Sequence, residues 1–577
     1  ISVQPVKNDQ QLIISFAMPS IDKFYRQKPE SILAYLIGHE GPGSILSLLK
    51  SKQWALALTA GSGINGSNFK DFNISISLSE LGKKNISAII SIVFSYLNLL
   101  KQDPLHEQYY QEKKALAELS FSYQEKLSPL DSVSQLVINM QHYPQQDYIF
   151  GDYVMQGLDE SVFNTLLGYM VATNVRIIVI GKNIQEESHK NTSKWYQVPY
   201  SITDIKQAKI EQWQQAPYLT ELSLPNKNPY IVSKPELISD DRKENPPLTP
   251  PTNICQESGL NVWFKQDTSF NTPKGYIYLS IDSPAVIENT STIAMTRLFI
   301  DLYSDAVIEE HYDAELAGIH YHLYSHQSGL TLQLSGISTK QEQLLPLLLN
   351  SLMQCDFCQE KFELFKQQLL SHWHNAENSK SISQLFANLS ATMQPKSPSS
   401  HTLINALQQV EFNQFKSFIT QIFQHTAIDV LIHGNWSRQS ADNIIADIKT
   451  IFKGKLSHKN QVKIPCIDIQ GQGTLTIPME LPEHDHAAVL YYPMPKKDLH
   501  TVALTMLTNQ LLSPIFFQEM RTEKQYGYLV GVGFIPINRY PGIAFYIQSP
   551  HTNSATLIAA MDSFIAKASD YIAELPK

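Results

Sequence analysis

The chain alternates between strand-like and helix-like patterns of apolar residues. Its first twenty residues, ISVQPVKNDQQLIISFAMPS, alternate apolar and polar positions, which predicts a half-buried strand. A continuous apolar run, NVRIIVIG at 174–181, predicts a buried strand that closes this first block. Between them, apolar residues recur every three or four positions and predict helices over 30–50, 85–101, 108–127 and 162–173.

A second block repeats this order of elements. It begins with the strand pattern LNVWFKQD at 260–267 and ends with the buried strand AIDVLIHGNW at 427–436. Helical periods at 292–316 and 342–353 lie between the two strands. We find no fixed-period sequence repeat, so the repetition is architectural, and each block is predicted to be an α+β domain.

The last block is about half as long as its predecessors. Strand patterns at 473–478, 487–493, 528–536 and 542–549 surround a helix at 501–522, and one more helix follows. We expect that the second half of this domain was cut away or that the native chain departs from the pattern here.

A proline-rich stretch separates the first two blocks. Residues 222–253 hold much of the chain's proline and almost no apolar periodicity, which is typical of an extended, partly polyproline II connector. The predicted organisation is therefore a domain at 1–217, a connector at 218–253, a domain at 254–460 and part of a domain at 461–577.

Composition excludes several classes of partner. The 577 residues are 43% hydrophobic and 17% charged, as in ordinary globular proteins, and the net charge is −9. This charge balance indicates neither a nucleic-acid partner nor a polybasic membrane contact, and no apolar run is long enough to span a bilayer. The chain does not begin with Met, so we expect a fragment from which a leader and an upstream domain have been removed.

Cysteine and histidine give no clear metal site. Cys355 and Cys358 have the spacing of a redox pair or half a zinc site, but no second pair accompanies them, and structural coincidence is the alternative. Histidines two residues apart could share a metal on a strand, yet no third ligand can be named, so solvated or hydrogen-bonded histidines are the preferred interpretation. These short pairs begin at His320, His372 and His484.

Two separated segments resemble the insulinase-type zinc metallopeptidases, the pitrilysin family. Residues 36–54 read LIGHEGPGSILSLLKSKQW and resemble the family's second domain, and residues 520–530 read MRTEKQYGYLV and resemble its fourth. Segments at 94–100, 222–230, 314–318 and 433–435 are similar to the family in the same order. The resemblance implies repeated domains, each with a mainly antiparallel sheet and helices packed on one face.

The family's zinc motif is absent from this sequence. His-x-x-Glu-His needs a histidine three residues before a Glu-His pair, but Val307 precedes Glu310-His311 and Glu480 precedes Glu483-His484. The arrangement His-Glu-x-x-His does not occur either. The resemblance therefore implies zinc bound by a missing N-terminal catalytic domain, with no metal ligand in this chain.

The resemblance also implies a peptide-binding exosite. In the family, an edge strand captures the N-terminal part of the substrate by strand addition. The matching substrate-binding residues here are on the strand and on the glycine-rich run that backs it; ordinary turn chemistry is the alternative interpretation of that run. They are Leu58, Thr59, Ala60 and Gly61 on the strand, and Gly38, His39, Glu40, Gly41 and Gly43 behind it.

Arg521 and Tyr528 are the catalytic candidates that the resemblance implies. In the family, an arginine and a tyrosine at these places bind peptide carbonyls and support the developing oxyanion as hydrogen-bond donors. Without the family, they would be interpreted as a helix-end arginine and a strand tyrosine.

The functional prediction follows from these features. The parent protein is expected to be a zinc-dependent metalloendopeptidase that degrades peptides in an enclosed chamber, and this chain is expected to be inactive alone. The alternative is a noncatalytic peptide-binding or assembly subunit of the same fold. Expected partners are peptide substrates and the missing catalytic domain, with a homodimer left open. A periplasmic or secreted location is implied by the resemblance to bacterial pitrilysin only.

Overall fold

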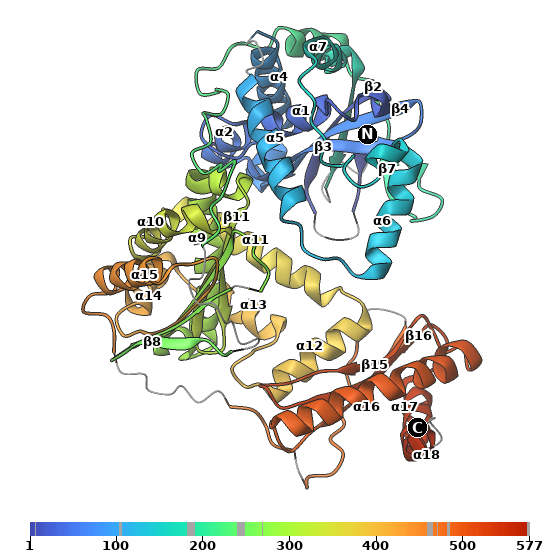
Figure 1. Ribbon diagram of the computed structural model, residues 1–577. Coiled ribbons are helices and arrows are strands. Elements are labelled where there is room, and N and C mark those ends of the chain that lie inside the picture. The colour runs from blue at the N-terminus through green and yellow to red at the C-terminus, as the bar shows by residue number, and fades with distance from the viewer. Residues whose placement is uncertain are drawn as a thin grey trace.

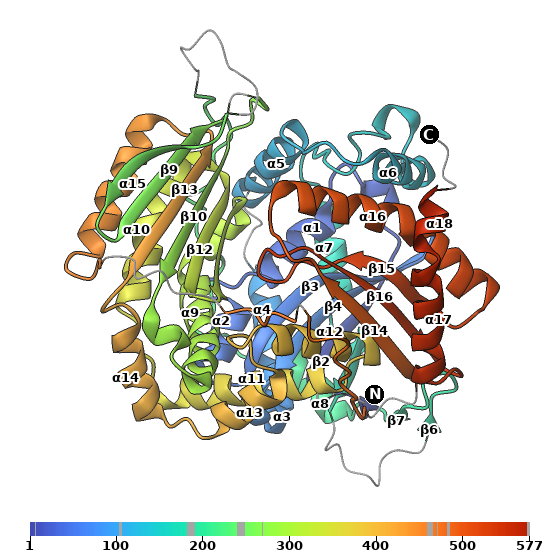
Figure 2. The same ribbon diagram turned by 90° about the horizontal axis from the view of Figure 1, so that it is seen from below.

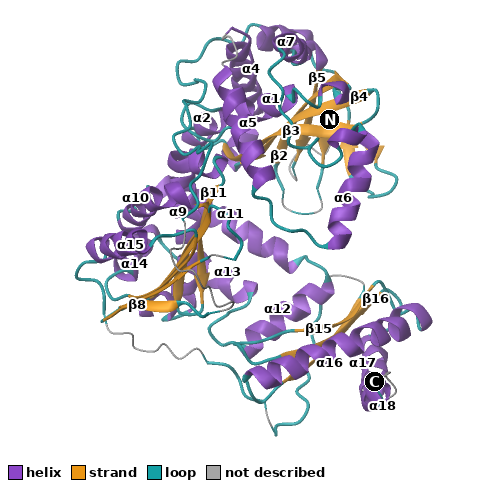
Figure 3. Ribbon diagram, viewed as in Figure 1, coloured by secondary structure: helices purple, strands orange, loops and turns teal. Residues whose placement is uncertain are grey.

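The computed structural model describes residues 1–5, 7, 9–102, 107–181, 191–238, 249–267, 269–457, 465–469, 471–481 and 485–573. Within these residues the strands form three sheets. Helices pack on one face of each sheet, and the three-stranded sheet has a further helix against its other face (Figures 1 and 3). We call each sheet with its helices a unit, numbered in chain order.

The first unit is built on a seven-stranded sheet in the order β3-β4-β2-β5-β1-β7-β6. Its strands are β1 (Ser2–Val3), β2 (Gln11–Pro19), β3 (Ala55–Asn65), β4 (Phe69–Leu78), β5 (Val175–Ile180), β6 (Asn191–Thr192) and β7 (Pro199–Ser201). Its helices are α1 (Pro29–Ile37), α2 (Ile45–Ser51), α3 (Glu80–Lys84), α4 (Ile86–Gln102), α5 (Glu107–Ser122), α6 (Pro129–His142), α7 (Glu160–Tyr169) and α8 (Gln207–Gln214).

The second unit has a six-stranded sheet in the order β11-β12-β10-β13-β9-β8. Its strands are β8 (Thr252–Glu257), β9 (Leu260–Gln266), β10 (Lys274–Asp282), β11 (Ile319–His326), β12 (Gly329–Ile337) and β13 (Ala427–Gly434). Its helices are α9 (Thr290–Leu316), α10 (Gln341–Met353), α11 (Gln359–Glu377), α12 (Ser381–Met393), α13 (Ser400–Gln408), α14 (Phe412–Ile422) and α15 (Arg438–Ile451).

The third unit is smaller, with a three-stranded sheet in the order β14-β16-β15. Its strands are β14 (His486–Pro493), β15 (Leu529–Phe534) and β16 (Gly542–Ser549). Its helices are α16 (Leu499–Phe517), which continues into the π-helical turn η7 (Gln518–Glu523), then α17 (Ser554–Ala566) and α18 (Ala568–Ala573).

The three sheets share one topology. In each unit a strand leads into the first helix, an antiparallel hairpin follows, and the first hairpin strand lies at the sheet edge: β3, β11 and β15. The first two units then return through several helices to β5 and β13, which pair antiparallel with β2 and β10. Parallel pairing is confined to β1 with β5 and β9 with β13 among the described strands. The predicted α+β class with mainly antiparallel sheets is confirmed.

Each unit buries its own apolar core between the sheet and its helices. Alternate residues of the strands, such as Ile14 and Phe16 on β2 or Ile277 and Leu279 on β10, are fully buried there. This alternation is the strand period that the sequence shows. The helices that the sequence predicts at 85–101, 292–316 and 342–353 correspond to α4, α9 and α10.

One predicted strand is wrong. Residues 473–478 form no strand, and Leu475 is 63% exposed. The apolar alternation is present there, but no sheet edge pairs with the segment, and alternation without a partner does not make a strand.

Figures 1 and 2 show how the units are arranged. In Figure 1 the first unit lies at the top, the second at the left and the third at the bottom right, and in Figure 2, seen from below, the third unit lies in front of the first. Among the described helices, none combines the length and the apolar character that a bilayer span requires.

Candidate functional site

The glycine-rich run at 38–44 is a turn between α1 and α2. The Gly38 N–H donates to the Ala34 carbonyl at 2.9 Å and ends α1, and the Ser44 hydroxyl accepts from the Ser47 N–H at 3.1 Å and caps α2. Gly43 has a φ of +80°, and a Cβ built there would lie 2.1 Å from the Ser223 Oγ. The backbone conformation therefore favours glycine at 43, and a larger residue there would also displace the Ser223 side chain.

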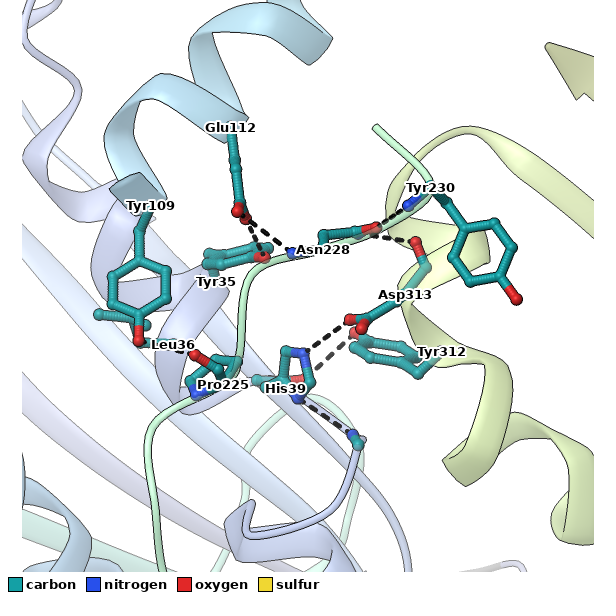
Figure 4. Close-up of polar contacts among 12 residues, drawn as sticks. Tyr35, Leu36, His39, Tyr109, Glu112, Pro225, Asn228, Tyr230, Tyr312 and Asp313 are labelled. Carbon is teal, nitrogen blue, oxygen red and sulfur yellow. Dashed lines mark hydrogen bonds and ion pairs between the residues drawn. The ribbon is translucent and has the colours of Figure 1, made fainter. Parts of the chain in front are cut away.

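His39 lies at the centre of this turn and is only 4% exposed. Its Nδ1 accepts a hydrogen bond from the Gly41 N–H at 3.0 Å, so the neutral ring carries its proton on Nε2. That Nε2 faces Asp313 Oδ1 at 3.5 Å, and the ring packs edge-on against Tyr312 with centroids 4.9 Å apart (Figure 4). Asp313 and Tyr312 belong to α9, so His39 joins the first unit to the second.

Further contacts between the same elements extend this junction. The Tyr312 hydroxyl donates to the Gly38 carbonyl at 3.3 Å, and the Ser47 hydroxyl donates to Glu309 Oε1 at 2.6 Å. The sequence analysis did not identify Tyr312 or Asp313, although they directly precede the matched segment at 314–318. No local signal links them to a turn about 270 residues away.

Asp305 on α9 anchors the far end of the junction. Its carboxylate lies 2.8 Å from Lys50 Nζ of α2 and 2.8 Å from Lys361 Nζ of α11. Burial alone would raise the pKa of Asp305, but the two ammonium groups hold it below its usual value. The ion pair is therefore formed at neutral pH.

The chain segment after α8 is packed into the same junction. Asn228 is 3% exposed; its backbone N–H donates to Glu112 Oε1 at 3.2 Å and its side chain donates to the Asp313 carbonyl at 2.7 Å (Figure 4). The Tyr35 hydroxyl donates to the other Glu112 oxygen at 3.4 Å. Burial raises the pKa of Glu112, and these donors partly offset that rise.

The predicted exosite strand is β3, at the edge of the first sheet. It pairs with β4, and within the described residues no strand pairs with its outer edge. Leu58 points into the core, whereas Thr59 is exposed and Ala60 and Gly61 are half-buried. Gly38 lies against this strand, because a Cβ built there would be 3.6 Å from the Ala60 backbone nitrogen.

The structure thus separates the predicted substrate-binding residues into two groups. Gly38 lies beside β3 and also accepts from Tyr312 of α9, whereas His39 and Gly41 face α9 and Gly43 faces Ser223. Glu40 is half-buried next to them, and burial raises its pKa.

The predicted catalytic pair lies in the third unit. The guanidinium carbon of Arg521 is 4.8 Å from the Phe517 ring centre and 5.4 Å from the Tyr528 ring centre, so Arg521 stacks between two aromatic rings. Tyr528 is 86% exposed. The two predicted residues are therefore adjacent, with the phenol directed into solvent.

Buried neighbours and a close approach to β16 fix the backbone around this pair. Arg521 belongs to η7, a π-helical turn of the kind that often marks functional positions, and its neighbour Met520 is fully buried. Gly527 precedes Tyr528, and a Cβ there would lie 2.1 Å from the Gln548 carbonyl oxygen, so only glycine lets the chain pass β16 this closely. Phe517 also borders an open groove of about 680 Å³ along α16.

The described part of the chain offers no metal centre. It contains no group of three or more His, Cys, Asp or Glu side chains that could hold an ion. Cys355 and Cys358 are free thiols, and burial raises the pKa of Cys355 to about 12, which makes it a poor thiolate. His320 is hydrogen-bonded to Glu315 at 2.7 Å, and His484 lies outside the described residues.

Three family models match successive parts of the chain. They are the peptidase M16 inactive domain at residues 1–116, the middle or third domain of peptidase M16 at 121–406, and the C-terminal lobe domain 4 of PQQ synthase PqqF-like proteins at 507–577. The matches follow one another in chain order.

Curated proteins and one solved structure agree with these models. The chain is 28% identical to bovine insulin-degrading enzyme over 564 residues, which is 95% of this chain and 54% of that protein. It is 28% identical to a nardilysin-like protein of Arabidopsis thaliana over 578 residues, 98% of this chain and 56% of that protein. The crystal structure of pitrilysin superposes with a TM-score of 0.66 at 22% identity, over 100% of this chain and 61% of that one.

The chain thus spans about half the length of the curated relatives it matches. The matched models, the relatives and the shared fold lead to one conclusion: the chain belongs to the insulinase-type M16 peptidase family and comprises middle and inactive domains of that fold.

Proposed function

We propose that this chain is the zinc-free portion of a zinc-dependent metalloendopeptidase that degrades peptides inside an enclosed chamber. In this proposal it supplies a peptide-binding edge strand and two transition-state donors. The zinc and its ligands come from an N-terminal catalytic domain. The described residues offer no set of side chains that fits zinc, so no step through the metal is assigned to them.

The observation that carries the proposal is the Arg521–Tyr528 pair. The Arg521 guanidinium lies 5.4 Å from the ring centre of Tyr528, which is 86% exposed. Both side chains are hydrogen-bond donors, and no other described group of this chain accepts a hydrogen bond from them. Donors held in place before the reaction stabilise an oxyanion more than flexible ones do, because they need no reorganisation when charge develops. Pure scaffolding would not need such donors.

The edge strand supports the peptide-binding part of the proposal. The outer edge of β3 can add an extended peptide as a further antiparallel or parallel strand, with Thr59 exposed beside it. Strand addition uses backbone groups, so it accepts many sequences. In this proposal the role of His39, Gly41 and Gly43 is to hold β3 and α9 together rather than to touch the peptide.

The catalytic role is tested with Tyr528→Phe in the enzyme that contains both this chain and the catalytic domain. We expect kcat to fall about 10- to 1000-fold, as when one oxyanion donor is removed. Tyr492→Phe is the matched control, because Tyr492 is another exposed tyrosine of the same unit. Equal kcat values for Tyr528→Phe and the unaltered enzyme would refute the role.

An activity assay distinguishes the proposed function from the alternative, a noncatalytic peptide-binding or assembly subunit. Purified chain alone is expected to show no zinc-dependent cleavage, and the two-part enzyme is expected to show it. Peptide binding with no cleavage by the two-part enzyme would favour the alternative.

The strand-addition mode has its own test. A fluorescent peptide and its backbone N-methylated analogue are titrated against the chain. N-methylation removes strand hydrogen bonds but keeps the side chains, so we expect at least a tenfold weaker Kd. Equal affinities would rule out strand addition at β3. A periplasmic or secreted location remains a proposal from the family resemblance.

A further inference from the structure

The strand β11 is an open edge of the second sheet. It pairs with β12 on its inner side, and within the described residues no strand pairs with its outer edge. By place in the fold it is the counterpart of β3, because each is the first strand of its unit's hairpin and lies at the sheet edge. The second unit therefore presents the same kind of edge that the proposed function assigns to peptide binding in the first.

The edge of β11 lacks the features that usually protect such a strand. Proteins protect sheet edges with charged side chains, proline, bulges or very short strands, because unpaired N–H and C=O groups attract other chains. At the opposite edge of the same sheet, β8 has a register shift between Asn253 and Cys255 and directly follows Pro250 and Pro251. In contrast, all 8 residues of β11 pair with β12 without a shift, and the sequence IHYHLYSH contains no Lys, Arg, Asp, Glu, Pro or Gly. A long, regular and unprotected edge indicates that a partner strand binds there.

The side chains of β11 divide between the two faces of the sheet. Ile319 and Leu323 are buried in the core beneath the helices, so the alternate residues face the opposite side. Among these, His322 is exposed and Tyr324 is half-buried, and their rings stack with centres 5.6 Å apart and planes inclined by 25°. Within the described residues neither ring has a hydrogen-bond partner. An imidazole N–H and a phenol O–H therefore remain as donors beside the open edge.

The part of this face that surrounds His322 has no unpaired carboxylate among the described residues. Glu315 is bonded to His320 at 2.7 Å, and Glu125 of the first unit is paired with Lys274 at 3.1 Å. The two rows that cross the sheet from His320 and from His322 contain no Asp or Glu; they are Ser335, Tyr276, His433 and Lys265 in the first row, and Gln333, Tyr278, Leu431 and Trp263 in the second.

The row of Tyr324 differs from these two in one respect. It contains one acidic residue, Asp429 on β13, which accepts a hydrogen bond from Asn261 at 2.9 Å. The donors at the edge therefore have no acidic neighbour of their own to bind. Such donors favour a ligand that offers acceptors only, and a carboxylate is a ligand of this kind.

The first unit flanks the beginning of β11. The helix α9, which leads into β11, is hydrogen-bonded to the turn at 38–44. Burial and then the charge of Glu315 raise the pKa of Tyr321, with smaller contributions from Tyr230 and from Glu40 of the first unit. A narrow, extended chain therefore matches this edge better than the sheet of a second folded copy, which needs a clear approach along the whole strand.

We propose that β11 is a second strand-addition edge, which binds an extended peptide with acidic side chains at alternate positions, their carboxylates accepting hydrogen bonds from His322 and Tyr324. Directly opposed residues of an antiparallel pair have Cβ atoms about 5 Å apart, so alternate peptide side chains come within reach of both rings. The inference rests on the peptide-binding part of the proposed function and deepens it, since it adds a second site and a preference for acidic peptides.

Hydrogen exchange tests where the peptide binds. The full 577-residue chain is mixed with a peptide in which Glu alternates with Thr, and deuterium uptake is followed in β11 and β3. Outward N–H groups of an open edge exchange quickly and become protected when a strand is added. We expect uptake in β11 to slow about tenfold or more. Protection confined to β3 would overturn the inference and leave the proposed peptide site standing, whereas protection of neither strand would overturn both. Dimers of the chain with β11 already protected before peptide is added would assign the edge to a second copy instead.

Side-chain substitutions test the acidic preference. The same peptide with Gln in place of Glu has the same shape without the charge, and we expect its Kd to be about tenfold weaker. His322→Phe and Tyr324→Phe keep an aromatic ring but remove the donors, so together they should abolish this difference. Tyr278→Phe is the matched control, because Tyr278 shares the row of His322 but lies on β10, away from the edge. Equal Kd values for the two peptides, or a loss of preference in Tyr278→Phe as large as in the double variant, would overturn the inference. Thermal unfolding of each variant verifies that the fold is intact.

Discussion

The two groups of predicted functional residues have opposite surroundings. The turn at 38–44 is packed between two units, with His39 4% exposed, whereas Tyr528 is 86% exposed in the third unit. Residues of the first kind are held by many neighbours, and residues of the second kind are available to a ligand. A segment that resembles a binding motif can therefore owe part of its sequence to packing, and substitutions can separate the two contributions.

The largest effect is expected at the buried carboxylate of the junction. Asp305→Asn leaves Lys50 and Lys361 without their partner, and breaking a buried pair of this kind costs about 3 kcal/mol. Urea unfolding monitored by tryptophan fluorescence measures the loss. Asp442→Asn is the control, because Asp442 forms an exposed pair with Arg438 and should cost less than about 0.5 kcal/mol.

The same carboxylate predicts a pH dependence. The folded pKa of Asp305 is lowered, so its contribution is present above the unfolded pKa of about 3.9 and is lost as pH falls through the lower folded pKa. Below about pH 4, Asp305→Asn should therefore lose less stability on acidification than the unaltered chain. Parallel stability curves between pH 6 and pH 3 would contradict the assigned ion pair.

A smaller loss is expected for Gly43→Ala. An alanine held at this positive φ destabilises the folded state by roughly 1 kcal/mol, and the displacement of Ser223 adds about as much again. Gly454→Ala is a matched control, since Gly454 has a φ of +76° and open space around it. Gly43→Ala should lower the unfolding free energy by about 1 kcal/mol more than Gly454→Ala does. Adding Ser223→Ala to Gly43→Ala should recover part of that difference.

The smallest effect on stability is expected at the exposed pair. Arg521→Ala should change the unfolding free energy by less than about 0.5 kcal/mol, although it removes the stacking on Phe517. In the two-part enzyme, the same change should lower kcat/KM at least tenfold. A large loss of stability with unchanged kcat/KM would place Arg521 with the packing residues instead.

Much of the fold could be predicted because its signals are local. The periods of α4, α9 and α10 and the buried strand β13 are visible in short windows of sequence. The helix α6 was missed, although Ser128 followed by Pro129 is a standard start signal that could have identified it. The division of the chain at 217, 253 and 460 stays a prediction.

The junction could not be predicted in the same way. Gly38 and Tyr312 are 274 residues apart, and no periodicity or spacing encodes such a contact. The Arg521–Tyr528 pair, by contrast, is separated by only seven residues, and the resemblance of the single run 520–530 to the family was enough to propose it. Distance along the chain, more than burial, decided what the sequence could indicate.

The hydrogen bonds of Asn228 limit how the molecule can move. This residue is bonded to Glu112 of the first unit and to the Asp313 carbonyl of the second, so the segment works as a strap rather than a hinge. Swinging these two units apart would break buried hydrogen bonds on both sides of it. The segment that links the first two units in sequence therefore also locks them in space.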